Sequence, residues 1–288
     1  MKLKQIVVVV IVVAIMGYLF KLDPVRLIVA KEGKPGAGAR ISETRAGNSS
    51  VNANIDANYV SAPAKTAVGS NLSAEITALE NSLKNAGSNT DKVKFETELA
   101  KKWDDVNQPA PAAFYYMAIA KEKNGYQDWV NAGDRFNDAF KLTQDTLAQP
   151  TFVGNAVEAF NNALKLNPNG LEAQTGLGIA DVNGGAPSPM TGIGLLLGVV
   201  AKDPNNRKAV LNLGTFAMKS GQYQKAVERF KTLIAKKEEL EPYFYLAESY
   251  KQLGMKKEAI DAYQKCKELM PDPAFGTRID EYIKELKN

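Results

Sequence analysis

Residues 240–273 read LEPYFYLAESYKQLGMKKEAIDAYQKCKELMPDP and contain two amphipathic segments separated by a glycine. In each segment, apolar and small residues recur three and four positions apart, which places them on one face of an α-helix. Gly254 suits the end of the first helix because glycine readily adopts the left-handed conformation found there, and Pro271 cannot continue the second. The two faces hold Tyr243, Leu246, Ala247 and Tyr250, then Ala259, Tyr263 and Cys266. The stretch therefore predicts two short helices joined by a tight turn.

The same pattern recurs upstream, as expected of a unit that cannot bury its own apolar face. Residues 207–239 repeat it in register, with Gly214, Ala226 and Phe230 at the equivalent positions. Less regular copies precede them, and a leading helical stripe begins near Asn71. The predicted helical array spans 71–288, with repeats at about 93–125, 126–170, 171–206, 207–239 and 240–273 and a capping helix at 274–287.

This arrangement resembles the tetratricopeptide repeat (TPR), a helix-turn-helix unit of about 34 residues with small or aromatic residues at fixed positions. With Leu240 as position 1, the small residue at position 8 is Ala247 and the alanine at position 20 is Ala259. Position 24 holds Tyr263 and position 32 holds Pro271. The resemblance covers about residues 93–273. It implies an all-α fold, a TPR-like α-solenoid with a right-handed superhelix, of the membrane-anchored bacterial type.

Composition argues against several classes of function. The chain of 288 residues contains no histidine, which removes the commonest general base and most zinc or haem ligation. Its 36 basic and 32 acidic residues give a net charge of +4, too small to indicate nucleic-acid binding. The sequence has no phosphate-binding loop, nucleophile motif or metal-ligand cluster, and Cys266 is expected to be a buried filler. We expect no enzyme activity, no cofactor, no metal and no small-molecule substrate.

Residues 6–20, IVVVVIVVAIMGYLF, are uncharged and almost wholly apolar, and they follow two lysines. With their flanks, residues 1–22 approach the length of about 20 residues that crosses a bilayer, so we expect an uncleaved transmembrane anchor. A cleaved signal peptide and a buried strand are the alternatives, although no A-x-A cleavage site follows. Residues 23–70, rich in Gly, Ala, Ser and Asn, predict a flexible linker between the anchor and the helices.

The side of the membrane that carries the repeats is open at this point. Five basic residues after the anchor favour the cytoplasm by the positive-inside rule. Two lysines followed at once by an apolar segment are instead typical of a signal-anchor, which delivers the rest of the chain outward. We expect a single-pass protein of the bacterial inner membrane with its repeats on the periplasmic side.

The resemblance also implies where a partner binds. In tetratricopeptide arrays the first helices of the repeats line a concave groove, and positions 2, 5, 9 and 12 face it. The expected groove residues are Thr175, Ile179, Val182, Leu211, Thr215, Met218, Phe244, Tyr245, Glu248 and Lys251. Their largely apolar character favours a hydrophobic peptide or helix as partner. The alternative is that Leu211, Met218 and Phe244 pack on neighbouring helices instead.

These patterns predict a non-enzymatic, membrane-tethered scaffold that binds a protein partner through the groove. The order of anchor and repeats also resembles the cytochrome c maturation proteins of bacterial envelopes, which would make the chain an assembly chaperone. A structural subunit of a membrane complex, using its convex or end surfaces, is a further alternative. The uncharged stretch Met190–Ala201 is a second candidate surface for any of these roles.

Overall fold

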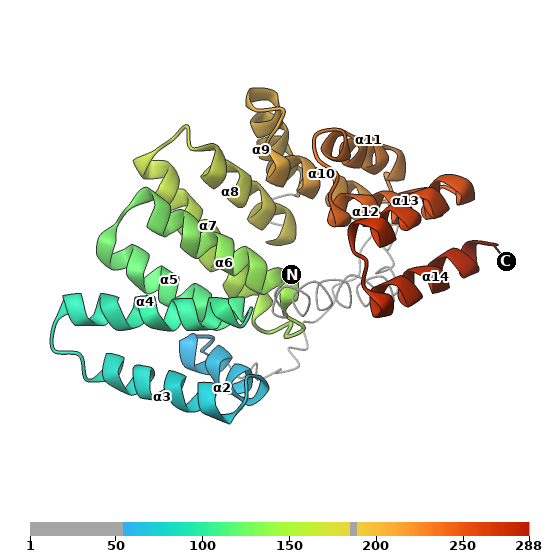
Figure 1. The fold of residues 1–288 in the computed structure, drawn as a ribbon. Helices are drawn as coiled ribbons and strands as arrows, with labels where there is room; N and C mark the ends of the chain where they lie inside the picture. The colour runs from blue at the N-terminus through green and yellow to red at the C-terminus, as the bar shows by residue number, and fades with distance from the viewer. Residues whose placement is uncertain (1–53, 185–188, 288) are drawn as a thin grey trace, which may run out of the picture. The chain divides into compact units, whose positions relative to one another are not determined.

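The computed structural model describes residues 54–184 and 189–287, and every regular element in these ranges is an α-helix (Figure 1). The helices are α2 (Ala57–Ala67), α3 (Ser70–Lys84), α4 (Asn89–Asp105), α5 (Pro109–Lys123), α6 (Tyr126–Leu142), α7 (Gln149–Leu166), α8 (Leu171–Gly184), α9 (Pro189–Lys202), α10 (Arg207–Lys219), α11 (Tyr223–Ile234), α12 (Leu240–Gln252), α13 (Lys256–Leu269) and α14 (Pro273–Lys287). The expected anchor, residues 1–22, and most of the expected linker lie outside the described residues. None of the helices in the described part of the chain combines the length and the apolar character needed to cross a membrane.

The helices stack in the order of the chain. From α4 onward each helix packs against the one before it and the one after it, and short connections join them (Figure 1). The successive pairs are α4 with α5, α6 with α7, α8 with α9, α10 with α11 and α12 with α13. The first helices of the last four pairs begin at Tyr126, Leu171, Arg207 and Leu240. The predicted all-helical stack is thereby confirmed for the described residues.

Small residues set the distance between the two helices of a pair. A Cβ atom added to Gly133 on α6 would lie 2.6 Å from the ring of Phe160 on α7. The next-but-one pair repeats this contact, since a Cβ atom on Gly214 would lie 2.6 Å from the Phe230 ring. Between α8 and α9 two backbones meet instead, and a Cβ atom on Gly192 would lie 2.4 Å from a carbonyl oxygen of α8. Any larger side chain at these glycines would push the helices apart.

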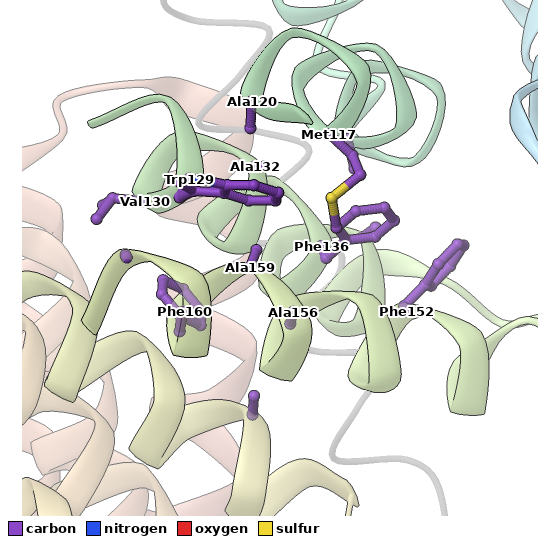
Figure 2. Close-up of a cluster of buried hydrophobic side chains, with 14 of the residues drawn as sticks. Met117, Ala120, Trp129, Val130, Ala132, Phe136, Phe152, Ala156, Ala159 and Phe160 are labelled. Atoms are coloured by element: carbon purple, nitrogen blue, oxygen red, sulfur yellow. The ribbon is translucent and has the colours of Figure 1, made fainter. Parts of the chain in front are cut away.

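A large core between α5, α6, α7 and α8 holds the middle of the stack together (Figure 2). Trp129, Phe136, Phe152 and Phe160 are at most 5% exposed there. The Trp129 indole Nε1 donates a hydrogen bond to Asn124 Oδ1 at 2.8 Å, so the ring is buried without leaving its N–H unpaired. Burying a large apolar side chain stabilises a fold by about 1.5–3 kcal/mol. This core therefore fixes α6, which carries part of the candidate site, against α8.

The prediction of a flexible linker up to residue 70 is wrong for its last part, because residues 57–67 form α2. The Asp56 carboxylate caps this helix by accepting a hydrogen bond from the Tyr59 N–H at 2.9 Å. Val60 and Ala64, one turn apart, are buried, and α2 packs on α3 and α5. The Tyr59 hydroxyl donates to Asp145 Oδ2, between α6 and α7, at 2.8 Å. These contacts attach α2 to the array.

α14 covers the end of the stack at α12 and α13. Ile279, Ile283 and Leu286, on one face of α14, are less than a tenth exposed. The Tyr282 ring stacks on Tyr263 of α13 with 5.6 Å between centroids and meets Phe244 of α12 edge to face. Phe244 and Tyr263 of the last repeat are thus buried beneath α14.

Candidate functional site

The ten residues expected to line a groove lie on α8, α10 and α12, and the structure buries most of them. Seven are less than a tenth exposed: Thr175, Ile179, Leu211, Met218, Phe244, Tyr245 and Glu248. Val182, Thr215 and Lys251 are partly exposed. Most of their apolar side chains are therefore covered by this chain itself, in line with the alternative that Leu211, Met218 and Phe244 pack on neighbouring helices.

Phe244 illustrates the reason for this burial. Its ring is 1% exposed and contacts the rings of Tyr263 and Tyr282 edge to face, with centroids 6.0 and 6.2 Å away. Tyr245 stacks on Phe230 of the preceding pair at 5.5 Å. Position 5 of this repeat thus faces α13 and α14, whereas position 6, held by Tyr245, faces the preceding pair.

Glu248, at position 9 of the same repeat, is also buried rather than exposed to a partner. Its side chain accepts a hydrogen bond from the Tyr263 hydroxyl, and burial raises the pKa of its carboxyl group. Lys251 on the same helix lowers that pKa and Glu285 on α14 raises it. Lys251 itself turns toward α14, with Nζ 3.3 Å from Glu285 Oε2 and 5.7 Å from the centre of the Tyr282 ring.

Ile179 and Thr175 on α8 are likewise part of the packing. Ile179 belongs to the apolar cluster that joins α8 and α9 to α10, together with Leu196 and Leu213. The Thr175 hydroxyl donates to the Leu171 carbonyl oxygen at 2.7 Å, within its own helix. Neither side chain is open to a partner in this structure.

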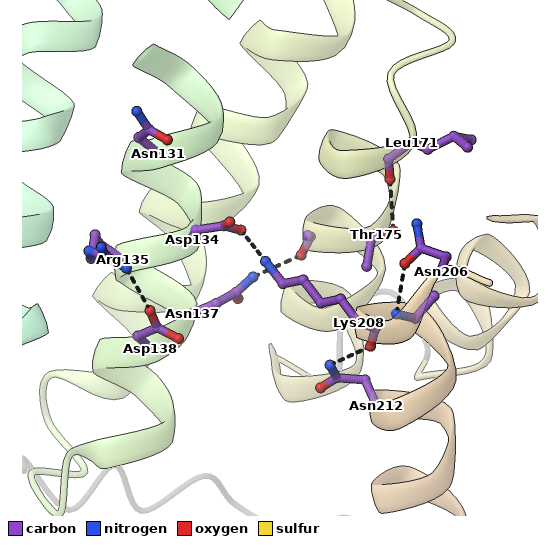
Figure 3. Close-up of polar contacts among 12 residues, drawn as sticks. Asn131, Asp134, Arg135, Asn137, Asp138, Leu171, Thr175, Asn206, Lys208 and Asn212 are labelled. Carbon is purple, nitrogen blue, oxygen red and sulfur yellow. Dashed lines mark hydrogen bonds and ion pairs between the residues drawn. The ribbon is translucent and has the colours of Figure 1, made fainter. Parts of the chain in front are cut away.

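Polar side chains occupy the surface between α6 and α10. On α6 they recur at i, i+3, i+7 and i+10, and on α10 at i, i+4, i+7 and i+11, so each set forms one stripe. We name this surface the polar face and define it by Asn131, Asp134, Asp138, Lys141, Lys208, Asn212, Thr215 and Lys219. Figure 3 shows Lys208 extending from α10 toward Asp134 on α6. Asn137, beside this stripe, donates from Nδ2 to the Gly176 carbonyl oxygen of α8 at 3.0 Å and joins the two helices.

Two charged groups of the polar face are exposed to water. The Asp138 side chain is 51% exposed, and its Oδ2 lies 3.1 Å from Arg135 Nη1. Desolvation raises the pKa of the Asp138 carboxyl group, against the opposing effect of Arg135. Lys219 is exposed as well, with Nζ 5.6 Å from the centre of the Phe216 ring. Desolvation and the nearby charge of Lys141 lower the pKa of the Lys219 ammonium group.

Two ion pairs join helices of repeats that are not neighbours in the chain. Lys208 Nζ on α10 lies 2.6 Å from Asp134 Oδ1 on α6. Lys141 Nζ at the end of α6 lies 3.7 Å from Glu241 Oε1 at the start of α12. We name these two contacts, Asp134–Lys208 and Lys141–Glu241, the inter-repeat ion pairs.

Asp134, Lys208 and Glu241 are not among the residues expected from the sequence, although the same positional rule contains them. Lys208 and Glu241 hold position 2 of the repeats that begin at Arg207 and Leu240. Asp134 holds position 9 of the repeat that begins at Tyr126. Extending the rule to position 2 and to that earlier repeat would have found all three.

Cys266, the single thiol of the chain, is buried on α13. Burial raises the pKa of this thiol to about 12, which keeps it protonated and unreactive near neutral pH. The prediction that Cys266 is a buried filler is confirmed. The described residues also hold no group of three or more Cys, Asp or Glu side chains arranged to bind a metal ion.

Comparison with known proteins identifies the repeat and the fold. The family model described as "Tetratricopeptide repeat" matches residues 240–273. TTC0263, a thermophilic TPR protein of Thermus thermophilus, is similar in structure with a TM-score of 0.51 and 18% identity, over 66% of this chain and 97% of that one. A tetratricopeptide repeat protein of Parabacteroides merdae ATCC 43184 has a TM-score of 0.54 and 13% identity, over 81% of this chain and 83% of that one. No protein with a curated description matches the sequence.

At these identities the similarity concerns the fold, and the residues of the polar face must be interpreted from this chain alone. The fold itself follows from three observations that agree: the register of residues 240–273, the stacked helix pairs and the matching structures. Residues 240–273 are similar to the tetratricopeptide repeat, and the described helices share the fold of tetratricopeptide repeat proteins.

Proposed function

We propose that this chain is a non-enzymatic scaffold that binds a protein partner through the polar face. The observation that carries the proposal is the arrangement of charge on α6 and α10, where two polar stripes meet over α8. Asp138 and Lys219 belong to these stripes, and both side chains are exposed to solvent. Repeat arrays typically use such extended surfaces on consecutive helices to bind other proteins.

The partner that fits this surface is a polar segment with charges of both signs. Asp134 and Asp138 place negative charge on the α6 stripe, and Lys141 places positive charge at its end, close to Lys219 of α10. From Asp134 to Lys141 the helix rises about 10 Å, which about three residues of an extended peptide span. A basic residue followed about three positions later by an acidic one would match both ends. This polar partner replaces the hydrophobic peptide or helix expected from the sequence.

Site-specific crosslinking in cells that express the full chain tests the proposal. A photoreactive amino acid replaces Asn212 on the polar face in one strain, and in the matched control it replaces Glu228, exposed on α11. We expect a discrete crosslinked protein from position 212 and none from position 228. Crosslinking from position 228 with none from position 212 would contradict a partner at the polar face.

The proposal includes tethering to the bacterial inner membrane by residues 6–20, with the repeats on the periplasmic side. It rests on the length and apolar character of that segment. The full chain should stay in the membrane fraction after alkaline carbonate washing, and its intact mass should include Met1. Protease added outside spheroplasts should digest the repeats. A mass lacking the first 20 or more residues would replace the anchor with a cleaved signal peptide.

A further inference from the structure

The inter-repeat ion pairs skip a repeat, and they therefore add a constraint that helix stacking does not supply. In a repeat array each repeat contacts mainly its neighbours, so the position of distant repeats results from many small rotations. Asp134 and Lys141 belong to α6, whereas Lys208 and Glu241 belong to α10 and α12. The pair α8–α9 stands between α6 and α10, and the pairs α8–α9 and α10–α11 both stand between α6 and α12. The first ion pair thus connects helices on the two sides of one intervening repeat, and the second connects helices on the two sides of two.

The inter-repeat ion pairs are accessible to solvent, which suits contacts that break and re-form. The Asp134 and Lys208 side chains are 31% and 44% exposed, and those of Glu241 and Lys141 are 26% and 56% exposed. Water and salt ions therefore reach both pairs, and salt weakens their attraction. Glu241 is held in place from a second side by Arg207, whose Nη2 lies 3.4 Å away.

We propose that the inter-repeat ion pairs form a clasp over the polar face, which holds α6 toward α10 and α12 and which a partner must open. Lys208 occupies, at Asp134, the place that a basic group of the partner takes. Glu241 occupies, at Lys141, the place of an acidic group. The clasp itself concerns this chain alone, whereas its competition with a partner rests on the proposed function.

Distance measurements between two spin labels test the clasp without any partner. Nitroxides on cysteines introduced at Gln127 on α6 and Gln252 on α12, both exposed, measure the distance between these two helices. Labels at Gln252 and Gln264, within one repeat, serve as the control, and the buried Cys266 stays unlabelled. Raising NaCl from 0.01 M to 1 M shortens the Debye length from about 30 Å to about 3 Å. We expect the 127–252 distance to lengthen by several ångströms and its distribution to broaden, while the control distance stays constant.

Charge exchange separates the clasp from a general effect of salt. Lys208→Glu places a carboxylate opposite Asp134 and should produce the long 127–252 distance already at 0.01 M NaCl. Combining Lys208→Asp with Asp134→Lys restores an ion pair in the opposite sense and should restore the short distance. An unchanged distance in Lys208→Glu, or a long one in the exchanged pair, would overturn the clasp. The control distance and the helical circular dichroism show that each variant is folded.

Crosslinking from position 212 tests the competition. Lys208→Gln frees Asp134 for the partner and should raise the yield of crosslinked protein several-fold. Asp134→Asn breaks the same ion pair but removes the carboxylate that the partner needs, so it should lower the yield. Equal changes in the same direction would overturn the competition. A complete absence of crosslinks, with the distance results as expected, would overturn the proposed function and leave the clasp in place.

Discussion

Two glycines of α9, two residues apart, should respond in opposite ways to the same substitution. Gly192 faces α8, where an added Cβ atom would lie 2.4 Å from the Gly178 carbonyl oxygen and 2.9 Å from the Val182 backbone nitrogen. Backbone atoms cannot rotate away, so Gly192→Ala must separate the two helices. Overpacking of this kind costs about 1–3 kcal/mol, and we expect the upper end. Alanine also has a higher helix propensity than glycine, which stabilises the folded protein by about 1 kcal/mol. The net decrease in the free energy of unfolding is therefore about 2 kcal/mol.

Gly194 is the matched control on the same helix. No atom lies within 4 Å of a Cβ atom added there. Gly194→Ala should therefore stabilise the protein by about 1 kcal/mol through helix propensity alone. For a domain of this size, 1 kcal/mol corresponds to about 2–4 °C in Tm. Gly192→Ala should lower Tm by about 4–8 °C, and Gly194→Ala should raise it by about 2–4 °C.

Thermal and urea unfolding of both variants, followed by circular dichroism at 222 nm, measures this difference. The two signals should agree in sign for each variant. If Gly192→Ala is as stable as Gly194→Ala, the close approach of α8 and α9 does not exist as described, and the packing of this repeat is wrong.

Three further predictions concern the last repeat. Phe244→Ala should lower the free energy of unfolding, measured in urea, by about 3–5 kcal/mol. Leu253→Ala, at a side chain 37% exposed, should change it by no more than about 0.5 kcal/mol. Similar decreases for both variants would place Phe244 at the surface. Cys266 should resist a thiol reagent at pH 8 until the repeat unfolds, because a pKa of about 12 leaves about one thiolate in ten thousand molecules; labelling at the rate of a free thiol would refute its burial. Burial raises the pKa of Glu248, so the folded protein binds this proton more tightly than the unfolded chain, and stability falls as pH rises above the ordinary glutamate pKa. Glu248→Gln should therefore raise Tm relative to the wild type by more at pH 7 than at pH 4, and a difference that does not change with pH would contradict this sign.

The fold was predictable because its determinants are local and repeated. Each repeat contains the whole pattern: apolar residues three and four positions apart, a small residue and an aromatic residue. The small and aromatic residues are Gly214 and Phe230 in one repeat and Ala247 and Tyr263 in the next. Each of these features corresponds to one contact between the two helices of a pair, and the copies support each other. The helix α2 lacks such a signal. Tyr59 and Val60 are the only large apolar residues of Ala57–Ala67, among alanine and polar residues.

The candidate site was less predictable because its determinants are distant in the chain. The resemblance indicates which side of each first helix faces a groove, but not how closely neighbouring pairs pack. Leu211 and Phe244 at position 5 are both buried, and Phe244 is covered by Tyr263 of α13 and Tyr282 of α14. The Asp134–Lys208 contact joins residues 74 positions apart. No periodicity within a single repeat contains that pairing, so only the three-dimensional structure shows that the polar stripes of α6 and α10 face each other.

The central claim is that a protein partner contacts the polar face, and lysine footprinting tests it most directly. The full chain is acetylated with and without the partner identified by crosslinking, and mass spectrometry measures the modification of each lysine. Lys141 and Lys219 lie on the polar face, and Lys225 on α11 and Lys257 on α13 are exposed controls. We predict that the partner lowers acetylation of Lys141 and Lys219 several-fold and leaves Lys225 and Lys257 unchanged. Protection of Lys225 and Lys257, with Lys141 and Lys219 as reactive as in the free protein, would contradict the proposed site.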